Sequence, residues 1–453
     1  MKLAHHYAYA RPSALSEAGL RLATSTPPDH AAPFLEADAR RPRAVALALR
    51  TVSEVVGMRY HVPAAMLARI LREADPVLTW GGDLLRVEGF SGCCGVYARA
   101  DIGAAALAPR DARHGTTNVD FNAPLRAALA RVRDNDPLAI RVGVDGVAVD
   151  AGGDPVVERR VALPLRWIRG FLEVQAVQRR MTPRLRLDRA GAVRFLRALP
   201  RHGRASDATW VVASGRGARL SARGRGDAVR VAGIQRLRTL EPLLPLAGGL
   251  DVHVDPVTGA SAWRLEAGEG VGLTLALSPE TWRGFSGEGQ ALEDLAGGAE
   301  GLARVRAALR WQAELSPAAL AAESGLDAEA VDGALAWLAT RGLVGWDVGR
   351  GAWFHRVLPF DLDAAVARIE AQHPRLAGAR RLLERPGAVT LLPATAPDTV
   401  EARVAGTGVT HVVHLRGDEA RCTCPWYARH RDTRGPCKHI LAAQLAWDEQ
   451  EIV

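Results

Sequence analysis

The sequence predicts an α+β protein in which helices alternate with short antiparallel strands. Three observations favour this class. Helical apolar spacing recurs between residues 43 and 300, short strand-like runs follow each helix in groups of three, and Gly or polar residues bound those runs. A chain of 453 residues with 48% hydrophobic content exceeds one compact core, so we expect two to four domains.

The first 42 residues hold five prolines and little periodicity. They predict an irregular N-terminal arm that packs onto the body. Residues 43–57 then show helical spacing, and residues 63–74 favour a second helix with a proline at its start. Strands are expected at 84–90, 94–101 and 117–121.

The region 43–300 repeats this order of one helix followed by three strands. The expected helices are 124–132, 189–199 and 234–246, and the strands after them are 138–142, 147–149, 156–163, 210–213, 218–222, 228–232, 250–254, 260–265 and 271–277. Curved antiparallel sheets backed by helices would accommodate these units. The order resembles the unit of DNA sliding-clamp domains, whose basic helices line a DNA channel. That resemblance implies DNA-facing arginines, with solvated helix faces as the alternative: Arg126, Arg131, Arg189, Arg194, Arg197, Arg236 and Arg238.

Residues 301–360 predict three helices, at 302–312, 316–324 and 327–341, and a hairpin of strands 343–347 and 352–357. This arrangement resembles a winged helix-turn-helix. The third helix would read DNA, yet it carries three acidic residues against one arginine, and anions oppose phosphate binding. We therefore expect a packing or protein-interaction module. Residues 361–397 predict a helical linker, interrupted near His373 and Pro374.

The C-terminal residues 398–453 predict two alternating strands, at 399–404 and 409–415, followed by a metal motif. Cys422 and Cys424 precede twelve intervening residues, and Cys437 and His439 follow them at the start of an amphipathic helix. Three thiolates and one imidazole suit tetrahedral Zn²⁺ and leave no open position, which indicates a structural rather than a catalytic site. The pattern C-x-C-x12-C-x-H resembles the SWIM zinc finger family in every ligand position. The resemblance implies a module that binds DNA or protein.

The loop between the two ligand pairs is basic and aromatic. The candidate nucleic-acid contacts are Arg429, Arg431, Arg434 and Lys438. The alternative is that these side chains are merely solvated. Trp426 and Tyr427 lie in the same loop, and for Trp426 we favour a role in capping the small zinc core.

The net charge of +8 comes almost entirely from arginine, because Lys2 and Lys438 are the only lysines. Guanidinium groups suit phosphate recognition, but a GC-rich genome would give the same composition, and the charge is spread along the chain rather than gathered in a tail. Cys93 and Cys94 are adjacent and lack a metal motif, so buried positions in a strand are expected for them.

Several function classes are disfavoured. The sequence has no Walker-type loop, no His/Glu metalloprotease spacing and no nucleophile elbow, so we expect no enzyme. It has no apolar run of about 18 residues, so no membrane partner is expected. Clustered cysteines indicate metal in a reducing cytoplasm.

Two further blocks, residues 91–97 and 116–121, together with the terminal finger resemble bacterial SWIM proteins. Those proteins are often encoded beside MoxR-type AAA+ ATPases and von Willebrand factor A proteins. The resemblance implies an adaptor for such an ATPase as the alternative to a nucleic-acid-binding protein.

Overall fold

The computed structural model describes residues 8–9, 14–16, 19–24, 34–58, 76–120, 126–127, 129–142, 158–159, 165–204, 207–268, 270–280, 284–287, 289–292, 301–358, 373–393, 399–416 and 419–451. The predicted helix 63–74 and strand 147–149 lie outside these ranges, as do residues 124, 125 and 128 of the predicted helix 124–132. None of the helices within the described ranges combines the length and hydrophobicity needed to span a bilayer.

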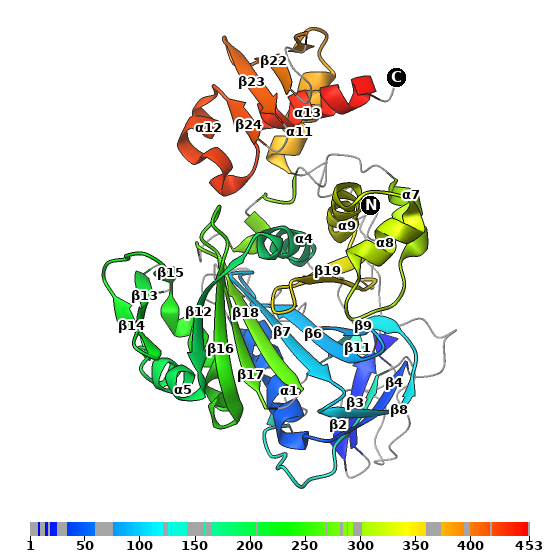
Figure 1. The fold of residues 1–453 in the computed structure, drawn as a ribbon, viewed down its shortest axis with the longest axis vertical. Coiled ribbons are helices and arrows are strands. Elements are labelled where there is room, and N and C mark those ends of the chain that lie inside the picture. The colour runs from blue at the N-terminus through cyan, green and yellow to red at the C-terminus, as the bar shows by residue number, and fades with distance from the viewer. Residues whose placement is uncertain are drawn as a thin grey trace.

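A large sheet forms the body (Figure 1). Among the described residues it has 13 strands in the order β12-β16-β17-β18-β7-β6-β5-β9-β3-β10-β4-β8, with β2 paired to β3. The strands are β2 (Ala14–Ser16), β3 (Gly19–Thr24), β4 (Leu35–Ala39), β5 (Val77–Trp80), β6 (Leu84–Phe90), β7 (Val96–Gly103), β8 (Leu107–Ala112), β9 (Gly115–Asp120), β10 (Ala139–Val142), β12 (Thr182–Asp188), β16 (Ala247–Val254), β17 (Ser261–Ala267) and β18 (Val271–Leu277). Within the described part of the chain, β10 with β3 is the one parallel pair of this sheet. The predicted antiparallel α+β class is thus confirmed.

The prediction of an irregular N-terminal arm is wrong for the residues that the structure describes. Strands β2, β3 and β4 belong to the large sheet, and β1 (Ala8–Tyr9) pairs with β11 (Glu158–Arg159). These strands could not be predicted from the sequence, because each is short, is flanked by proline-containing segments and has too few apolar residues to show the alternation of a β-strand. Distant pairing partners complete the strands, and a local pattern does not reveal such partners.

One face of the central strands packs under the helix α1 (Pro42–Gly57). Val45, Leu49, Val52 and Val56 recur at helical spacing along α1 and are buried. The helix begins at Pro42, whose missing amide hydrogen costs nothing in the first turn. The predicted helix 43–57 is therefore present.

The opposite face of β6 and β7 carries charged side chains that are completely buried. They meet a hairpin made of β19 (Val344–Asp347) and β20 (Ala352–His355). Arg86 Nη2 lies 3.0 Å from Asp347 Oδ2, and Arg99 Nη2 lies 2.6 Å from Asp347 Oδ1. Arg356, just beyond β20, places Nη1 2.7 Å from Glu88 Oε1. Because every charge has a partner, this polar layer fixes the hairpin on the sheet.

Three helices precede this hairpin, as the sequence predicts: α7 (Leu302–Ala308), α8 (Pro317–Ser324) and α9 (Ala328–Thr340). Helix α9 packs against α4 (Leu165–Arg179), and Arg179 Nη1 lies 3.1 Å from Asp332 Oδ2. Most of α9 is buried. The helix that a winged helix would use to read DNA therefore has one face in the core and contacts α4, while the winged-helix assignment itself stays a prediction.

A second sheet, β14-β13-β15, stands beside the large one (Figure 1). Its strands β13 (Ala208–Ser214), β14 (Gly217–Ser221) and β15 (Val229–Ala232) are antiparallel, and α5 (Arg189–Arg197) packs between it and β16. The segment η2 (Ile234–Leu246), predicted as a helix, is a 3-10 helix. Pro242 and Pro245 explain this difference, because neither can donate the amide hydrogen bond of an α-helix.

The C-terminal residues form a third unit around a four-stranded sheet. Its elements are α11 (Pro374–Leu383), β21 (Val389–Leu391), β22 (Thr399–Ala405), β23 (Thr410–Arg416), β24 (Glu419–Cys422), α12 (Pro425–His430), the 3-10 helix η4 (Arg431–Arg434) and α13 (Lys438–Glu451). β21 pairs with β22, and α11 packs on α13. The expectation that residues 361–397 are a helical linker is corrected accordingly, because 374–391 belong to this unit. Residues 359–372 lie outside the described part of the chain.

Candidate metal centre

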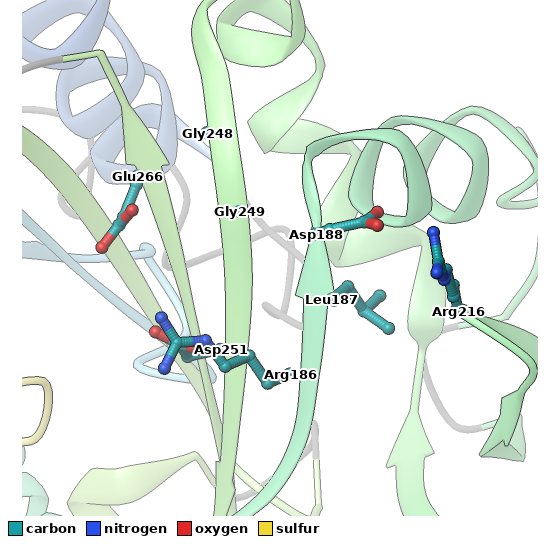
Figure 2. A pocket seen from close by; sticks show the side chains of 8 residues that line it. All are labelled: Arg186, Leu187, Asp188, Arg216, Gly248, Gly249, Asp251 and Glu266. Atoms are coloured by element: carbon teal, nitrogen blue, oxygen red, sulfur yellow. Dashed lines mark ion pairs between the residues drawn. The ribbon is translucent and has the colours of Figure 1, made fainter.

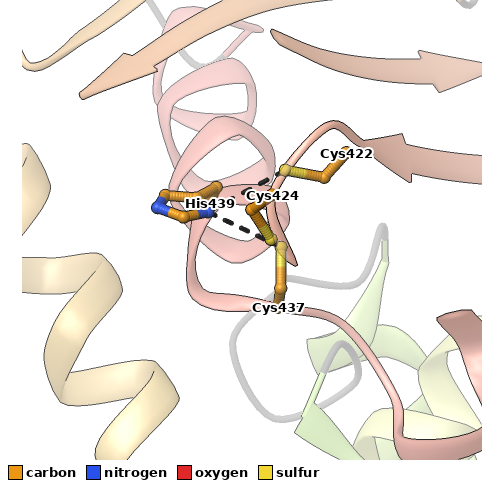
Figure 3. A group of neighbouring side chains, drawn as sticks. All are labelled: Cys422, Cys424, Cys437 and His439. Atoms are coloured by element: carbon orange, nitrogen blue, oxygen red, sulfur yellow. Dashed lines mark hydrogen bonds between the residues drawn. The ribbon is translucent and has the colours of Figure 1, made fainter. Parts of the chain in front are cut away.

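Four side chains from three elements converge in the C-terminal unit (Figure 3). Cys422 ends β24, and Cys424 caps the N-terminus of α12. Cys437 immediately precedes α13, and His439 lies in its first turn. Pro425 at the start of α12 turns the chain directly after the second cysteine, so two ligands from one strand end can approach the two ligands of the helix start.

The ligand atoms of this cluster lie within 4.8 Å of one another. His439 Nδ1 is 3.8 Å from Cys422 Sγ and 4.0 Å from Cys437 Sγ. Tetrahedral zinc with ordinary bond lengths sets its ligand atoms roughly 3.5–3.8 Å apart. All four residues are buried, each no more than 7% exposed. The donor set and spacing fit Zn²⁺, and the four protein ligands complete its coordination.

Backbone amides supply hydrogen bonds to the sulfurs. Tyr427 N–H donates to Cys424 Sγ at 3.3 Å, and Ile440 N–H donates to Cys437 Sγ at 3.5 Å. The hydrogen bond from the Cys422 thiol lowers the pKa of Cys437 to about 4 and, with burial, raises the pKa of Cys422. A buried thiolate at neutral pH needs a counter-charge, and a divalent metal supplies it.

These observations decide what the unit is. Residues 411–448 match the SWIM zinc finger family. The chain thus carries a SWIM zinc finger with Cys422, Cys424, Cys437 and His439 as the ligands of Zn²⁺. The predicted family and cofactor are confirmed.

Comparison with curated proteins finds no match for the chain. Among solved structures, the proliferating cellular nuclear antigen of Entamoeba histolytica aligns at 11% identity and a TM-score of 0.36, over 55% of this chain and 99% of that one. The PCNA2-PCNA3 complex of Sulfolobus tokodaii aligns at 9% identity and a TM-score of 0.33, over 55% of this chain and all of that one. At these scores the likeness carries no functional argument, and the clamp-like arrangement stays a prediction.

The predicted nucleic-acid contacts of the SWIM finger do not share one environment. Arg429, Arg431 and Lys438 are exposed. Arg434 is half-buried, and its guanidinium lies 6.0 Å from the Trp426 ring. Trp426 itself is partly buried against the finger's core, in keeping with the capping role predicted for it.

A pocket of about 530 Å³ opens beside the zinc ligands. Its lining includes His414, Arg421, Tyr427 and Arg431. The backbone of Arg431 has φ 44°, an uncommon conformation for a residue other than glycine. Spacing along the sequence does not reveal this pocket, because β23 brings His414 beside a loop that follows it.

The residues that hold the zinc loop against α11 and against the body carry no sequence motif. Arg375 Nη1 donates to Arg434 O at 2.7 Å and to Pro436 O at 2.6 Å, and its guanidinium lies 4.8 Å from the Trp426 ring. Gly435 approaches the backbone of Gly289 so closely that a Cβ there would overlap it. Gly289, Gly435 and Arg375 belong to no recognisable sequence motif, so their contacts could not be predicted from the sequence.

Glu173 on α4 supports the same junction from the body. Its carboxylate accepts hydrogen bonds from the amides of Gln290 and Ala291, at 2.6 and 3.2 Å. Burial raises the pKa of Glu173 to about 7, although these amides act in the opposite direction. The zinc loop thus rests on a segment that a buried, readily protonated carboxyl group holds in place.

Two other expectations need correction. Arg236, proposed for a DNA-facing helix surface, is 1% exposed and donates to the carbonyl groups of Gly95, Ala232 and Ser278. Its side chain ties η2 to the sheet instead. Cys93 and Cys94 are buried, as expected, but they lie in the turn between β6 and β7 rather than in a strand.

Proposed function

We propose that the protein is a non-catalytic interaction protein that recognises nucleic acid through its SWIM finger, in a cytoplasmic setting that keeps its thiols reduced. The observation that carries this proposal is the pocket beside the zinc site. Arg421, Arg431 and His414 supply cationic or hydrogen-bonding groups, and Tyr427 supplies an aromatic ring. Guanidinium groups pair with phosphates, and aromatic rings stack on unpaired bases.

The metal site supports the non-catalytic part of the proposal. Its four protein ligands saturate tetrahedral zinc, and a catalytic zinc requires a position for water or substrate. The finger would present its basic loop on a scaffold already ordered by the metal, so little conformational entropy is lost on binding.

A double variant, Arg429→Ala with Arg431→Ala, tests the proposal. We expect it to weaken binding of a labelled single-stranded oligonucleotide and to reduce the salt slope by about 1.4, since each phosphate contact contributes about 0.7 on single strands. Arg385→Ala with Arg403→Ala is the matched control, because both are exposed arginines of the same unit outside the pocket. Zinc content should be unchanged in both. Equal binding by wild type and the Arg429→Ala, Arg431→Ala variant would refute recognition through the finger.

One observation favours a second candidate, an adaptor that binds a protein partner. The finger from residue 399 onward is electrically balanced, with seven basic and seven acidic side chains: Arg403, Arg416, Arg421, Arg429, Arg431, Arg434 and Lys438 against Glu401, Asp418, Glu419, Asp432, Asp448, Glu449 and Glu451. A neutral module gains little from counterion release. The candidate partners are a MoxR-type AAA+ ATPase and a von Willebrand factor A protein. Calorimetry with each purified partner tests it, and a salt-insensitive heat of binding is expected.

A further inference from the structure

The positive charge of this protein is concentrated in one segment. Residues 182–232 hold twelve arginines and three aspartates, a formal charge of +9, whereas the whole chain carries +8. The remaining 402 residues are therefore close to neutral. The basic residues are not gathered in a tail, as expected, but a net charge counted over the whole sequence hides this local excess.

All twelve of these arginines are exposed: Arg184, Arg186, Arg189, Arg194, Arg197, Arg201, Arg204, Arg216, Arg219, Arg223, Arg225 and Arg230. We call them the arginine surface. Two form long ion pairs, Arg184 with Asp227 and Arg186 with Asp251, each at 3.6 Å. The other ten have no ion pair with any residue in the described ranges. Unpaired exposed cations attract a polyanion through the counterions that it releases.

One face of the small sheet β14-β13-β15 packs on the core, and the other face carries part of the arginine surface. Val211, Val229 and Val231 are buried toward α5 and the main core. On the other face, Arg219 pairs across from Val212, and Arg230 pairs across from Trp210. The two arginines flank the central strand β13, two strand spacings apart and offset by two residues along it, which sets their Cα positions roughly 12 Å apart.

The turn between β14 and β15 adds two more arginines in a fixed position. It reads Arg223-Gly224-Arg225-Gly226. A Cβ at Gly224 would overlap the ring of Trp210, so the turn rests directly on that indole. Ser221 Oγ donates to Arg223 O at 2.8 Å and accepts from Arg223 N–H at 3.2 Å. The turn is thus anchored at its start and at its centre.

The acidic residues mark where this surface ends. A pocket of about 550 Å³ lies between β12, β16 and the β13–β14 turn, and Figure 2 shows Asp188 directed toward Arg216 and Asp251 beside Arg186. With Glu266 also in its lining, this pocket holds both signs of charge. Asp188 also caps α5 by accepting from Gly191 N–H. The uncompensated positive charge therefore lies away from the pocket, on the small sheet and its turn.

We propose that the arginine surface binds the phosphodiester backbone of a nucleic acid. Charge complementarity selects a polyanion. A membrane would need apolar side chains for insertion, and the exposed large hydrophobics among the described residues, Val357 and Val409, lie elsewhere. A protein interface would need an apolar centre, and this face offers only the partly covered Trp210 and Val212. The inference shares a ligand class with the proposed function, but it does not require the finger.

The test uses full-length protein with zinc bound and labelled single- and double-stranded oligonucleotides. One variant replaces Arg219, Arg223, Arg225 and Arg230 by alanine. A second replaces the same four by lysine. The charge-matched control replaces four exposed arginines elsewhere, Arg113, Arg133, Arg306 and Arg385, by alanine. Anisotropy is measured between about 50 and about 200 mM salt, and vesicles of phosphatidylcholine with about one quarter phosphatidylserine serve as the competing anionic surface.

We expect the alanine variant to bind duplex at least about tenfold more weakly near 100 mM salt, with the salt slope reduced by up to about 3.6. The lysine variant should retain most of the slope, and the control should bind like wild type. The finger variant Arg429→Ala with Arg431→Ala separates the two proposals, since loss of binding in that variant alone would overturn the arginine surface and leave the finger. Wild-type binding to the vesicles but not to oligonucleotides, or equal losses in the alanine variant and the control, would also overturn it. Circular dichroism confirms that the variants fold.

Discussion

The two modules that follow the large sheet are attached to it by different physical means. The module of residues 301–358 is held by buried ion pairs, in which Arg86, Arg99 and Glu88 of the sheet meet Asp347 and Arg356 of the hairpin. The SWIM finger is held internally by four metal ligands and externally by close glycine contacts and by Arg375. A metal stabilises one module by itself, whereas the other module depends on the surface beneath it.

This difference separates folding from docking. Zinc binding supplies the folding free energy of a small finger, so such a finger folds or unfolds with its metal. Buried ion pairs contribute little net free energy compared with apolar packing, but losing one partner leaves an uncompensated charge. We therefore expect the finger to respond to metal removal without loss of the body, and the 301–358 module to respond to single charge substitutions.

The largest effect is expected for Cys437→Ser. Apparent zinc-binding free energies of about 10–16 kcal/mol are typical of structural fingers. The variant keeps only three of the four ligands, so it should lose much of this binding free energy. Purified wild type should hold one zinc per chain, and the variant should lose it while the large sheet stays folded. Metal analysis and limited proteolysis measure both. Wild-type protein prepared without chelator and lacking stoichiometric metal would contradict the zinc assignment.

Asp347→Asn should give the next largest effect, about 3–5 kcal/mol of destabilisation. Burial opposes the ionisation of Asp347, but Arg99 and Arg86 outweigh it and hold its pKa below the ordinary range. A lowered pKa contributes stability above the unfolded pKa near 3.9 that is lost as the pH falls further. Urea unfolding at pH 7 and about pH 3 should therefore show a smaller difference between wild type and variant near pH 3. Exposed Asp83→Asn is a control that should change little.

The same contrast explains what the sequence can predict. Cys422, Cys424, Cys437 and His439 occur within eighteen residues, and metal chemistry restricts such spacing to few geometries, so the zinc site was predictable. Arg86 and Asp347 are 261 positions apart. Charged residues such as these are usually exposed, and their burial is favourable only because each is paired with an opposite charge. No local pattern carries that information, nor does it place β2, β3 and β4 in the sheet.

At the junction between finger and body, Glu173→Gln should change the pH dependence of stability. With a folded pKa of about 7 against about 4.3 unfolded, the folded state retains a proton between these values that the unfolded state has released. Wild-type stability therefore falls as the pH rises through this window, by roughly 4 kcal/mol from this group. Glutamine keeps an acceptor for the amides of Gln290 and Ala291 without ionising. Urea titrations from pH 4.5 to 8 should show the variant gaining stability relative to wild type as the pH rises, and parallel curves would contradict the assignment.

Arg375→Ala should have a smaller effect, about 2 kcal/mol, because it removes two charge-assisted hydrogen bonds and the contact with Trp426. One of those bonds ends on Pro436, the residue before a zinc ligand. Groups that position ligands typically change metal affinity by about tenfold. Competition with a colorimetric chelator should show faster zinc loss from this variant, while Arg385→Ala, an exposed arginine of the same unit, should behave like wild type.

The smallest effect is expected on α9. Asp332→Asn weakens the half-exposed pair with Arg179, at a cost below about 1 kcal/mol, and keeps an acceptor for Trp353 Nε1. Because α9 packs against α4, replacing Asp332 by asparagine together with the exposed Glu329 by glutamine should not raise nucleic-acid affinity. A DNA-reading helix would behave in the opposite way, since each acid removed from a phosphate-facing surface strengthens binding and steepens its salt dependence. Anisotropy with duplex at low salt distinguishes the two. An increase in affinity would mean that α9 leaves α4 to meet DNA, and the buried ion pairs of the hairpin would then have to open as well.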